Sequence, residues 1–128
     1  MMTESNNWLK QAEADLRSSE NSLKSRDYYL SAFMSQQAVE KGLKAVYIEK
    51  KRSLLKTHSI SALAKELMLP SNLLNKISDL ETVYQETRYP DVSKKIPAEE
   101  YGENDATDLL NVAMEVMIWI RNQMKLRK

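Results

Sequence analysis

The sequence predicts an all-α fold, an up-and-down antiparallel bundle of about five helices, and three observations support this prediction. Apolar residues recur at intervals of three and four along most of the chain, which places them on one face of a helix. The 128 residues include only two glycines and three prolines, so there is little material for tight β-turns. No segment alternates apolar and polar residues over a strand's length. A chain of this length can bury one core, and we expect a single helical domain over residues 1–128.

The first two expected helices are long and adjacent in the sequence. The first follows a polar cap region at residues 5–7 and frays at residues 24–26. The second opens at Asp27, whose side chain suits an N-cap, and runs to about Lys50. We expect the second helix to be the most buried element. Its inner face comprises Tyr29, Ala32, Phe33, Gln36, Val39, Leu43, Val46 and Tyr47.

Two shorter helices are expected next. The helix over residues 60–67 can be capped by Thr57 or Ser59, because a hydroxyl oxygen accepts hydrogen bonds from the first amides of a helix. The following helix starts with Ser71 as its expected cap and runs through Tyr84.

A long irregular stretch, residues 87–104, separates these helices from the last one. Loops of this length in a compact domain are commonly functional. The last helix is expected over residues 105–125, with acidic residues at its start and basic residues at its end, as the helix dipole favours. Its inward face is predicted to comprise Ala106, Leu109, Leu110, Ala113, Val116, Met117, Ile120 and Met124.

The charge balance and the residue types exclude several classes of function. Nineteen basic residues stand against 18 acidic ones, so the chain lacks the basic excess of a protein that coats duplex DNA. It has no cysteine and one histidine, His58, whereas a zinc site needs three or four such ligands. We expect no metal site and no cofactor, apart from a magnesium ion that would accompany a bound nucleotide.

The hydropathy pattern bears on localisation. No segment approaches about 18 consecutive apolar residues, the length at which a membrane-spanning helix becomes a candidate. Residues 1–10 lack the basic start and the apolar run of a secretion signal. These features predict a cytoplasmic protein without a membrane partner.

Four segments carry a resemblance to a known family. Residues 36–45 read Gln-Gln-Ala-Val-Glu-Lys-Gly-Leu-Lys-Ala, and residues 57–63 read Thr-His-Ser-Ile-Ser-Ala-Leu. Residues 84–91 read Tyr-Gln-Glu-Thr-Arg-Tyr-Pro-Asp, and residues 12–16 of the first helix read Ala-Glu-Ala-Asp-Leu. In this order, and spread over most of the chain, they resemble the motifs of HEPN domains, the higher eukaryote and prokaryote nucleotide-binding domains.

The resemblance implies a bundle of about five helices that is often a homodimer. Members of the family are commonly encoded beside, or fused to, a minimal nucleotidyltransferase, which is the partner it implies here. Some members bind nucleotides. Others are metal-independent ribonucleases that act as toxins in toxin–antitoxin pairs.

The ribonuclease branch uses an arginine and a histidine separated by four to six residues, and Arg52 and His58 satisfy that spacing. In that branch, however, the motif lies late in the chain, where this sequence has Arg121 and no histidine. A histidine can act as a general base near neutral pH. The alternative role for His58 is packing and hydrogen bonding at the start of the third helix.

Gln37, Lys41 and Lys44 are spaced by four and three residues, so they share a helix face with Glu40. An amide and two ammonium groups in a row can hold a phosphate or a base. The alternative is structural: one of the lysines pairs with Asp15 of the first helix, and Glu40 pairs with Lys44 on the helix surface.

Arg88 and Tyr89 are the expected phosphate and base contacts of the long loop, since a guanidinium binds phosphate in a bidentate manner and a tyrosine ring stacks on bases. Alternatively, they close the loop at the end of the fourth helix. The basic run at residues 50–52, together with Lys56, either attracts phosphate or is a solvated helix end.

The sequence therefore predicts a non-catalytic, dimeric nucleotide-binding module that works with a nucleotidyltransferase. Arg88, Tyr89, Lys41, Lys44 and Gln37 are its candidate binding residues. One alternative is a ribonuclease toxin that uses Arg52 and His58 on RNA. Another is a scaffold that binds only protein.

Overall fold

A computed structural model of the chain describes residues 2–88 and 96–125, with the backbone alone described for residues 84–88 and 97. These residues form helices and no strand, which confirms the all-α prediction. The helices are α1 (Thr3–Lys24), α2 (Tyr28–Lys51), α3 (Ile60–Glu66), α4 (Ser71–Leu74), α5 (Ser78–Arg88), α7 (Pro97–Glu100) and α8 (Glu103–Lys125).

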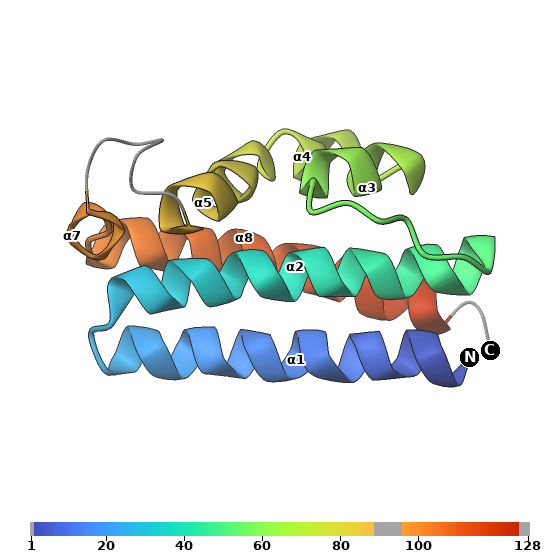
Figure 1. Cartoon of the computed structure of the whole chain (residues 1–128), viewed down its shortest axis with the longest axis horizontal. Helices are drawn as coiled ribbons and strands as arrows, with labels where there is room; N and C mark the ends of the chain where they lie inside the picture. The colour runs from blue at the N-terminus through green and yellow to red at the C-terminus, as the bar shows by residue number, and fades with distance from the viewer. Residues whose placement is uncertain (1, 89–95, 126–128) are drawn as a thin grey trace.

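The helices form an up-and-down bundle (Figure 1). The long helices α1, α2 and α8 run along the molecule, and α3, α4 and α5 cover them on one side. Helix α2 runs antiparallel to α1, the segment from α3 to α5 returns, and α8 then runs in the same direction as α2. Within the described part of the chain, no helix is both long and apolar enough to cross a lipid bilayer.

Helix α2 is the central element, as predicted. It packs against α1, α3, α5, α7 and α8, and 14 of its 24 residues are buried. Burial on several sides explains why its apolar residues do not form a single stripe. It also means that the polar residues of α2 need partners inside the bundle.

Helix α8 closes the core with the face that the sequence predicts. All eight predicted inward residues are buried. All of them except Ala106 belong to one hydrophobic cluster. This cluster also contains apolar side chains of α1, α2, α3, α4 and α5. Arg121 of α8 also binds Glu13 of α1 in a bidentate manner, with distances of 2.8 and 2.6 Å, and this contact raises the pKa of the guanidinium.

Two of the predicted helix N-caps are confirmed and a third is wrong. The Asp27 side chain caps α2 by accepting from the amide of Leu30, and Ser59 caps α3 by accepting from the amide of Ala62. The prediction for Ser71 was wrong, because it is the first residue of α4 and its side chain makes no capping hydrogen bond. The single predicted helix 71–84 is instead two helices, α4 and α5, with a turn at residues 75–77.

The predicted cap region at residues 5–7 lies inside α1, which begins at Thr3. The Ser5 hydroxyl is buried and donates to the Glu49 carboxylate at 2.6 Å, so it ties α1 to the end of α2 instead of capping a helix. The amide of Met2 donates to the same carboxylate. The Ser5 hydrogen bond, followed by the Met2 amide, lowers the pKa of Glu49 below its usual value.

Small side chains let α1 and α2 approach closely. The hydroxyl of Ser19 donates to the Ser31 carbonyl at 2.8 Å, and the hydroxyl of Ser31 donates to the Ser19 carbonyl at 3.0 Å. Ser35 completes this buried group through its hydroxyl, 2.7 Å from that of Ser19. Each buried hydroxyl therefore has a partner across the helix pair.

Gly42 marks the close approach of α2 and α8. A Cβ atom at this position would lie 2.6 Å from Cδ1 of Ile120 and 3.1 Å from Sδ of Met117. The glycine costs helix propensity but leaves room for these two side chains.

We predict that Gly42→Val destabilises the protein by about 1–3 kcal/mol, because a branched side chain overpacks this contact. Gly42→Ala should change stability by less than about 1 kcal/mol, since the gain in helix propensity offsets a small shift of the Ile120 terminus. Chemical denaturation followed by far-UV circular dichroism measures both. Gly102→Val is the matched control, because the nearest atom to its Cβ would be 3.6 Å away. Equal losses at Gly42 and Gly102 would contradict the packing argument.

Candidate functional site

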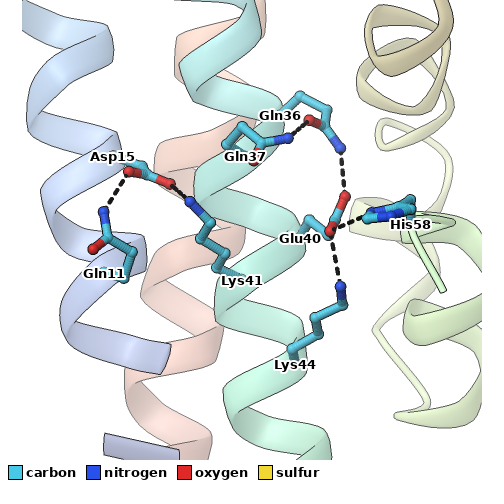
Figure 2. Close-up of polar contacts among 8 residues, drawn as sticks. All are labelled: Gln11, Asp15, Gln36, Gln37, Glu40, Lys41, Lys44 and His58. Carbon is cyan, nitrogen blue, oxygen red and sulfur yellow. Dashed lines mark hydrogen bonds and ion pairs between the residues drawn. The ribbon is translucent and has the colours of Figure 1, made fainter. Parts of the chain in front are cut away.

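The centre of the candidate site is the carboxylate of Glu40, which is buried on α2 with a relative exposure of 4%. Its Oε2 accepts from Lys44 Nζ at 2.9 Å and lies 3.1 Å from His58 Nδ1, and its Oε1 accepts from Gln36 Nε2 at 3.0 Å (Figure 2). A buried carboxylate needs a countercharge and hydrogen bonds, and these three side chains supply them.

Lys44 is also buried, with 8% of its side chain exposed. Its ammonium lies 5.4 Å from the centre of the Trp8 ring on α1, within the range of a cation–π contact. The sequence had suggested that Glu40 and Lys44 pair on the helix surface. The pair forms but is buried, because loop 52–59 and the start of α1 cover this part of α2.

His58 reaches the same carboxylate from the segment between α2 and α3, which runs back along α2 (Figure 1). Its side chain is 62% exposed. The buried carboxylate therefore orients an imidazole ring that is also accessible to ligands. This is the geometry that orients a base in many catalytic sites, although it equally anchors the start of α3.

Lys41 pairs with Asp15, as the structural alternative predicted. Lys41 Nζ lies 2.6 Å from Asp15 Oδ2, and Gln11 Nε2 donates to the other oxygen of the carboxylate at 2.9 Å (Figure 2). Asp15 is buried, so this ion pair ties α1 to α2. Gln37 Nε2 donates to Gln36 Oε1 at 2.6 Å and thus supports the residue that binds Glu40.

Two grooves open beside these pairs. One, of about 260 Å³, is lined by Lys44, Leu54, Lys56, Thr57 and His58, and we call it the loop groove. The other, of about 440 Å³, is lined by Glu4, Asn7, Trp8, Gln11 and Lys41, and we call it the Trp8 groove. The contact between Lys44 and Trp8 links the two, because each groove is lined by one member of this pair.

The structure separates Arg52 from His58 within one chain. Arg52 caps the end of α2 in a left-handed conformation, whereas His58 contacts Glu40, twelve residues earlier on the same helix. At 1.5 Å per residue, these points are about 18 Å apart along the helix axis. Arg52 therefore lies at the end of α2, while His58 is held by a carboxylate several turns earlier on the same helix.

The other predicted residues contribute less to this geometry. Tyr89 lies outside the described residues, and Arg88 is described only as the last backbone position of α5. Of the basic run at residues 50–52, none lines either groove, while Lys56 lines the loop groove. In the described part of the chain, no group of three histidine or acidic residues is arranged to hold a metal ion.

Trp8 is the residue whose role the sequence did not reveal. Its place in the apolar stripe of the first helix predicts a core residue, and it does pack against the core. It also lines a groove and stacks on Lys44. The signal available in the sequence was its position, one helical turn before Gln11 and two before Asp15, on a face that also carries polar side chains.

These features define a small helical bundle whose central helix carries two lysines, each paired with a buried carboxylate, beside two surface grooves. The sequence model of the HEPN domain matches residues 5–123. The chain belongs to the HEPN family.

Three known proteins are similar to it. "Putative toxin MJ1304" from Methanocaldococcus jannaschii is 31% identical over 132 residues, with 92% of this chain and 86% of that protein covered. The crystal structure of TT1696 from Thermus thermophilus matches with a TM-score of 0.87 and 28% identity, over 95% of this chain and 99% of the other. The crystal structure of ST0689, an archaeal HEPN homologue, matches with a TM-score of 0.82 and 33% identity, over 95% and 98%.

We predict that Glu40→Leu destabilises the protein by about 3 kcal/mol or more, because Lys44 is left buried without a countercharge. The double variant Glu40→Leu/Lys44→Met should recover most of this loss, since it replaces the pair with apolar side chains of similar size. Thermal and urea denaturation measure both variants. As a control, Glu115→Leu removes one member of an exposed pair with Lys76 and should cost less than about 1 kcal/mol. A double variant as unstable as Glu40→Leu would mean that the charge is not the cause.

Proposed function

We propose that this protein is a nucleotide-binding HEPN module, that the loop groove binds the phosphate of its ligand, and that it works as a homodimer with a minimal nucleotidyltransferase. The observation that carries the proposal is the lining of this groove. It brings together Lys44, Lys56 and His58, all able to carry a positive charge, and the hydroxyl of Thr57. Such groups bind phosphate oxygens through charge-assisted hydrogen bonds.

The arrangement of charge favours the loop residues over the α2 lysines as the main phosphate contacts. Asp15 neutralises Lys41, and Glu40 neutralises Lys44. An ammonium has three donors, so Lys44 can still contribute one hydrogen bond to a ligand. The additional positive charge comes from Lys56, and the His58 ring adds a further hydrogen-bonding group. A magnesium ion would enter only with a nucleoside polyphosphate.

The proposed partner and cellular role are supported by membership of the family and by the name of one relative. The name of one relative, "Putative toxin MJ1304", supports a role for this chain as one half of a toxin–antitoxin pair. The nucleotidyltransferase would be the other half. The balanced charge of the chain, a net of +1, suits a local phosphate site and not a surface that coats nucleic acid.

We predict that ATP and inorganic tripolyphosphate bind saturably in a calorimetric titration and that Lys56→Ala and His58→Ala each weaken binding about tenfold. The expected loss corresponds to one charge-assisted hydrogen bond. Lys65→Ala is the matched control, because it removes an exposed lysine of α3 that lines neither groove.

Two other outcomes of this titration would redirect the search. Binding that survives in Lys56→Ala and His58→Ala but is lost in Arg88→Ala would move the site to the end of α5. An absence of heat with every ligand would remove the nucleotide role and favour the protein-binding scaffold.

A second candidate function is a metal-independent ribonuclease, and the contact between Glu40 and His58 favours it. His58, oriented by the carboxylate, would take the proton from a ribose 2′-hydroxyl as that oxygen attacks the adjacent phosphorus. The bond to the 5′-oxygen breaks, this oxygen takes a proton from solvent, and a 2′,3′-cyclic phosphate remains. In a dimer, Arg52 of the second copy would contact the phosphate.

This candidate predicts that His58→Ala and Arg52→Ala each abolish cleavage of single-stranded RNA. Mixing the two inactive variants should restore part of the activity, because mixed dimers contain one site with both residues intact. Gel analysis of a labelled RNA, with detection of the cyclic phosphate, measures this. Arg26→Ala is the control, since Arg26 is also an exposed arginine with positive φ just after a helix. Intact RNA with the wild-type protein would reject the candidate.

A further inference from the structure

The Trp8 groove differs in chemistry from the loop groove. It is lined by an indole ring, two amide side chains, one carboxylate and one lysine. The lysine, Lys41, is neutralised by Asp15, and the carboxylate of Glu4 adds a negative charge. A phosphate would therefore meet no excess of positive charge in this groove. A flat, neutral ring with polar edges suits it better.

The polar groups of this groove are mainly hydrogen-bond acceptors. Gln11 uses its amide nitrogen to donate to Asp15, which leaves its amide oxygen as the group that can accept from a ligand. The carboxylate of Glu4 is an acceptor when ionised. Asn7 can both donate and accept. These groups match a base with an exocyclic amino group, such as adenine, guanine or cytosine, better than they match uracil.

The Trp8 groove lies next to the loop groove, the proposed phosphate site. Trp8 lines one groove and Lys44 lines the other, and the Lys44 ammonium lies 5.4 Å from the centre of the Trp8 ring. The chemistry of the two neighbouring grooves suits a ligand with a ring at one end and several phosphates at the other.

We propose that the Trp8 groove is the nucleobase subsite of this protein, in which the base of a nucleoside di- or triphosphate stacks on the indole of Trp8. Its phosphate chain extends past Lys44 to Lys56 and His58. Glu4 and Gln11 accept hydrogen bonds from the exocyclic amino group of the base. This inference rests on the phosphate site proposed above and names the part of the ligand that the second groove recognises.

Fluorescence of Trp8 tests the stacking directly. The chain has two tryptophans, so Trp119→Phe leaves Trp8 as the only one. In that background we expect ATP to quench the emission saturably, while inorganic tripolyphosphate binds without quenching. Trp8→Leu should weaken ATP binding about tenfold, as the loss of one base–aromatic stack does, and should leave tripolyphosphate binding unchanged.

Trp8 also packs against the core, so Trp8→Leu can weaken binding by disturbing the fold as well as by removing the stack. A second variant, at an exposed position, separates these two effects. Glu4 is exposed, so Glu4→Gln should not affect folding. The wild type should bind ATP more tightly than UTP, and Glu4→Gln should reduce this preference. Far-UV circular dichroism verifies that each variant is folded.

The outcomes separate the base subsite from the phosphate site. Equal binding of ATP and tripolyphosphate, with no quenching and no effect of Trp8→Leu, overturns the base subsite while the phosphate site stands. No binding of either ligand by the wild type overturns both. Quenching by ATP together with equal affinity for ATP and UTP, unchanged in Glu4→Gln, supports the stacking and overturns the role of Glu4.

Discussion

The burial of the Glu40 carboxylate on the central helix is the constraint on which the surrounding structure depends. An ionised carboxylate removed from water costs several kcal/mol unless it is paired and hydrogen-bonded. Glu40 obtains its partners from α2 itself, through Gln36 and Lys44, and from the segment before α3, through His58. The contact with His58 ties the segment before α3 to α2. Asp15 imposes a similar requirement on α1, which Lys41 satisfies. The face that carries both grooves is therefore held by two buried carboxylates.

The same pairs determine which ligand charges the face can accept. Lys41 and Lys44 are conspicuous in the sequence, but each already balances a buried carboxylate. The charge that remains for a ligand comes from side chains of the loop, so the two grooves differ in polarity although they lie close together. Under the proposals above, one groove takes the phosphate and the other takes the uncharged ring. The difference between the grooves arises because Lys41 and Lys44 are paired with buried carboxylates, and not from the number of lysines in the chain.

Much of the fold could be predicted from the sequence, because local signals and burial agree. Asp27 and Ser59 each accept from a first-turn amide of the helix that follows them, as their positions predict, and the inward face of α8 follows from its apolar spacing alone. Ser5 was misassigned because a long-range partner, Glu49, takes its hydroxyl. For the same reason the Glu40–Lys44 pair was expected on the surface: spacing along a helix predicts that two side chains meet, but not what covers them. The Trp8 groove likewise depends on how α1 packs beside Lys41 of α2, and spacing along a single helix does not predict that packing.

The conformation of Arg52 bears on whether this residue has a role beyond structure. It adopts a left-handed conformation, φ 57°, which costs a side chain-bearing residue about 1–2 kcal/mol relative to the right-handed helix and costs glycine little. Two local effects offset this cost. Its amide donates to the Ile48 carbonyl, and its positive charge lies at the negative end of α2, where it also lowers the pKa of Glu49. A helix-capping role thus accounts for an arginine at this position without catalysis. His58, in contrast, is oriented by a buried carboxylate and has an exposed side chain. We therefore place the proposed ligand contacts in the loop groove, and not at a site built from Arg52 and His58 together.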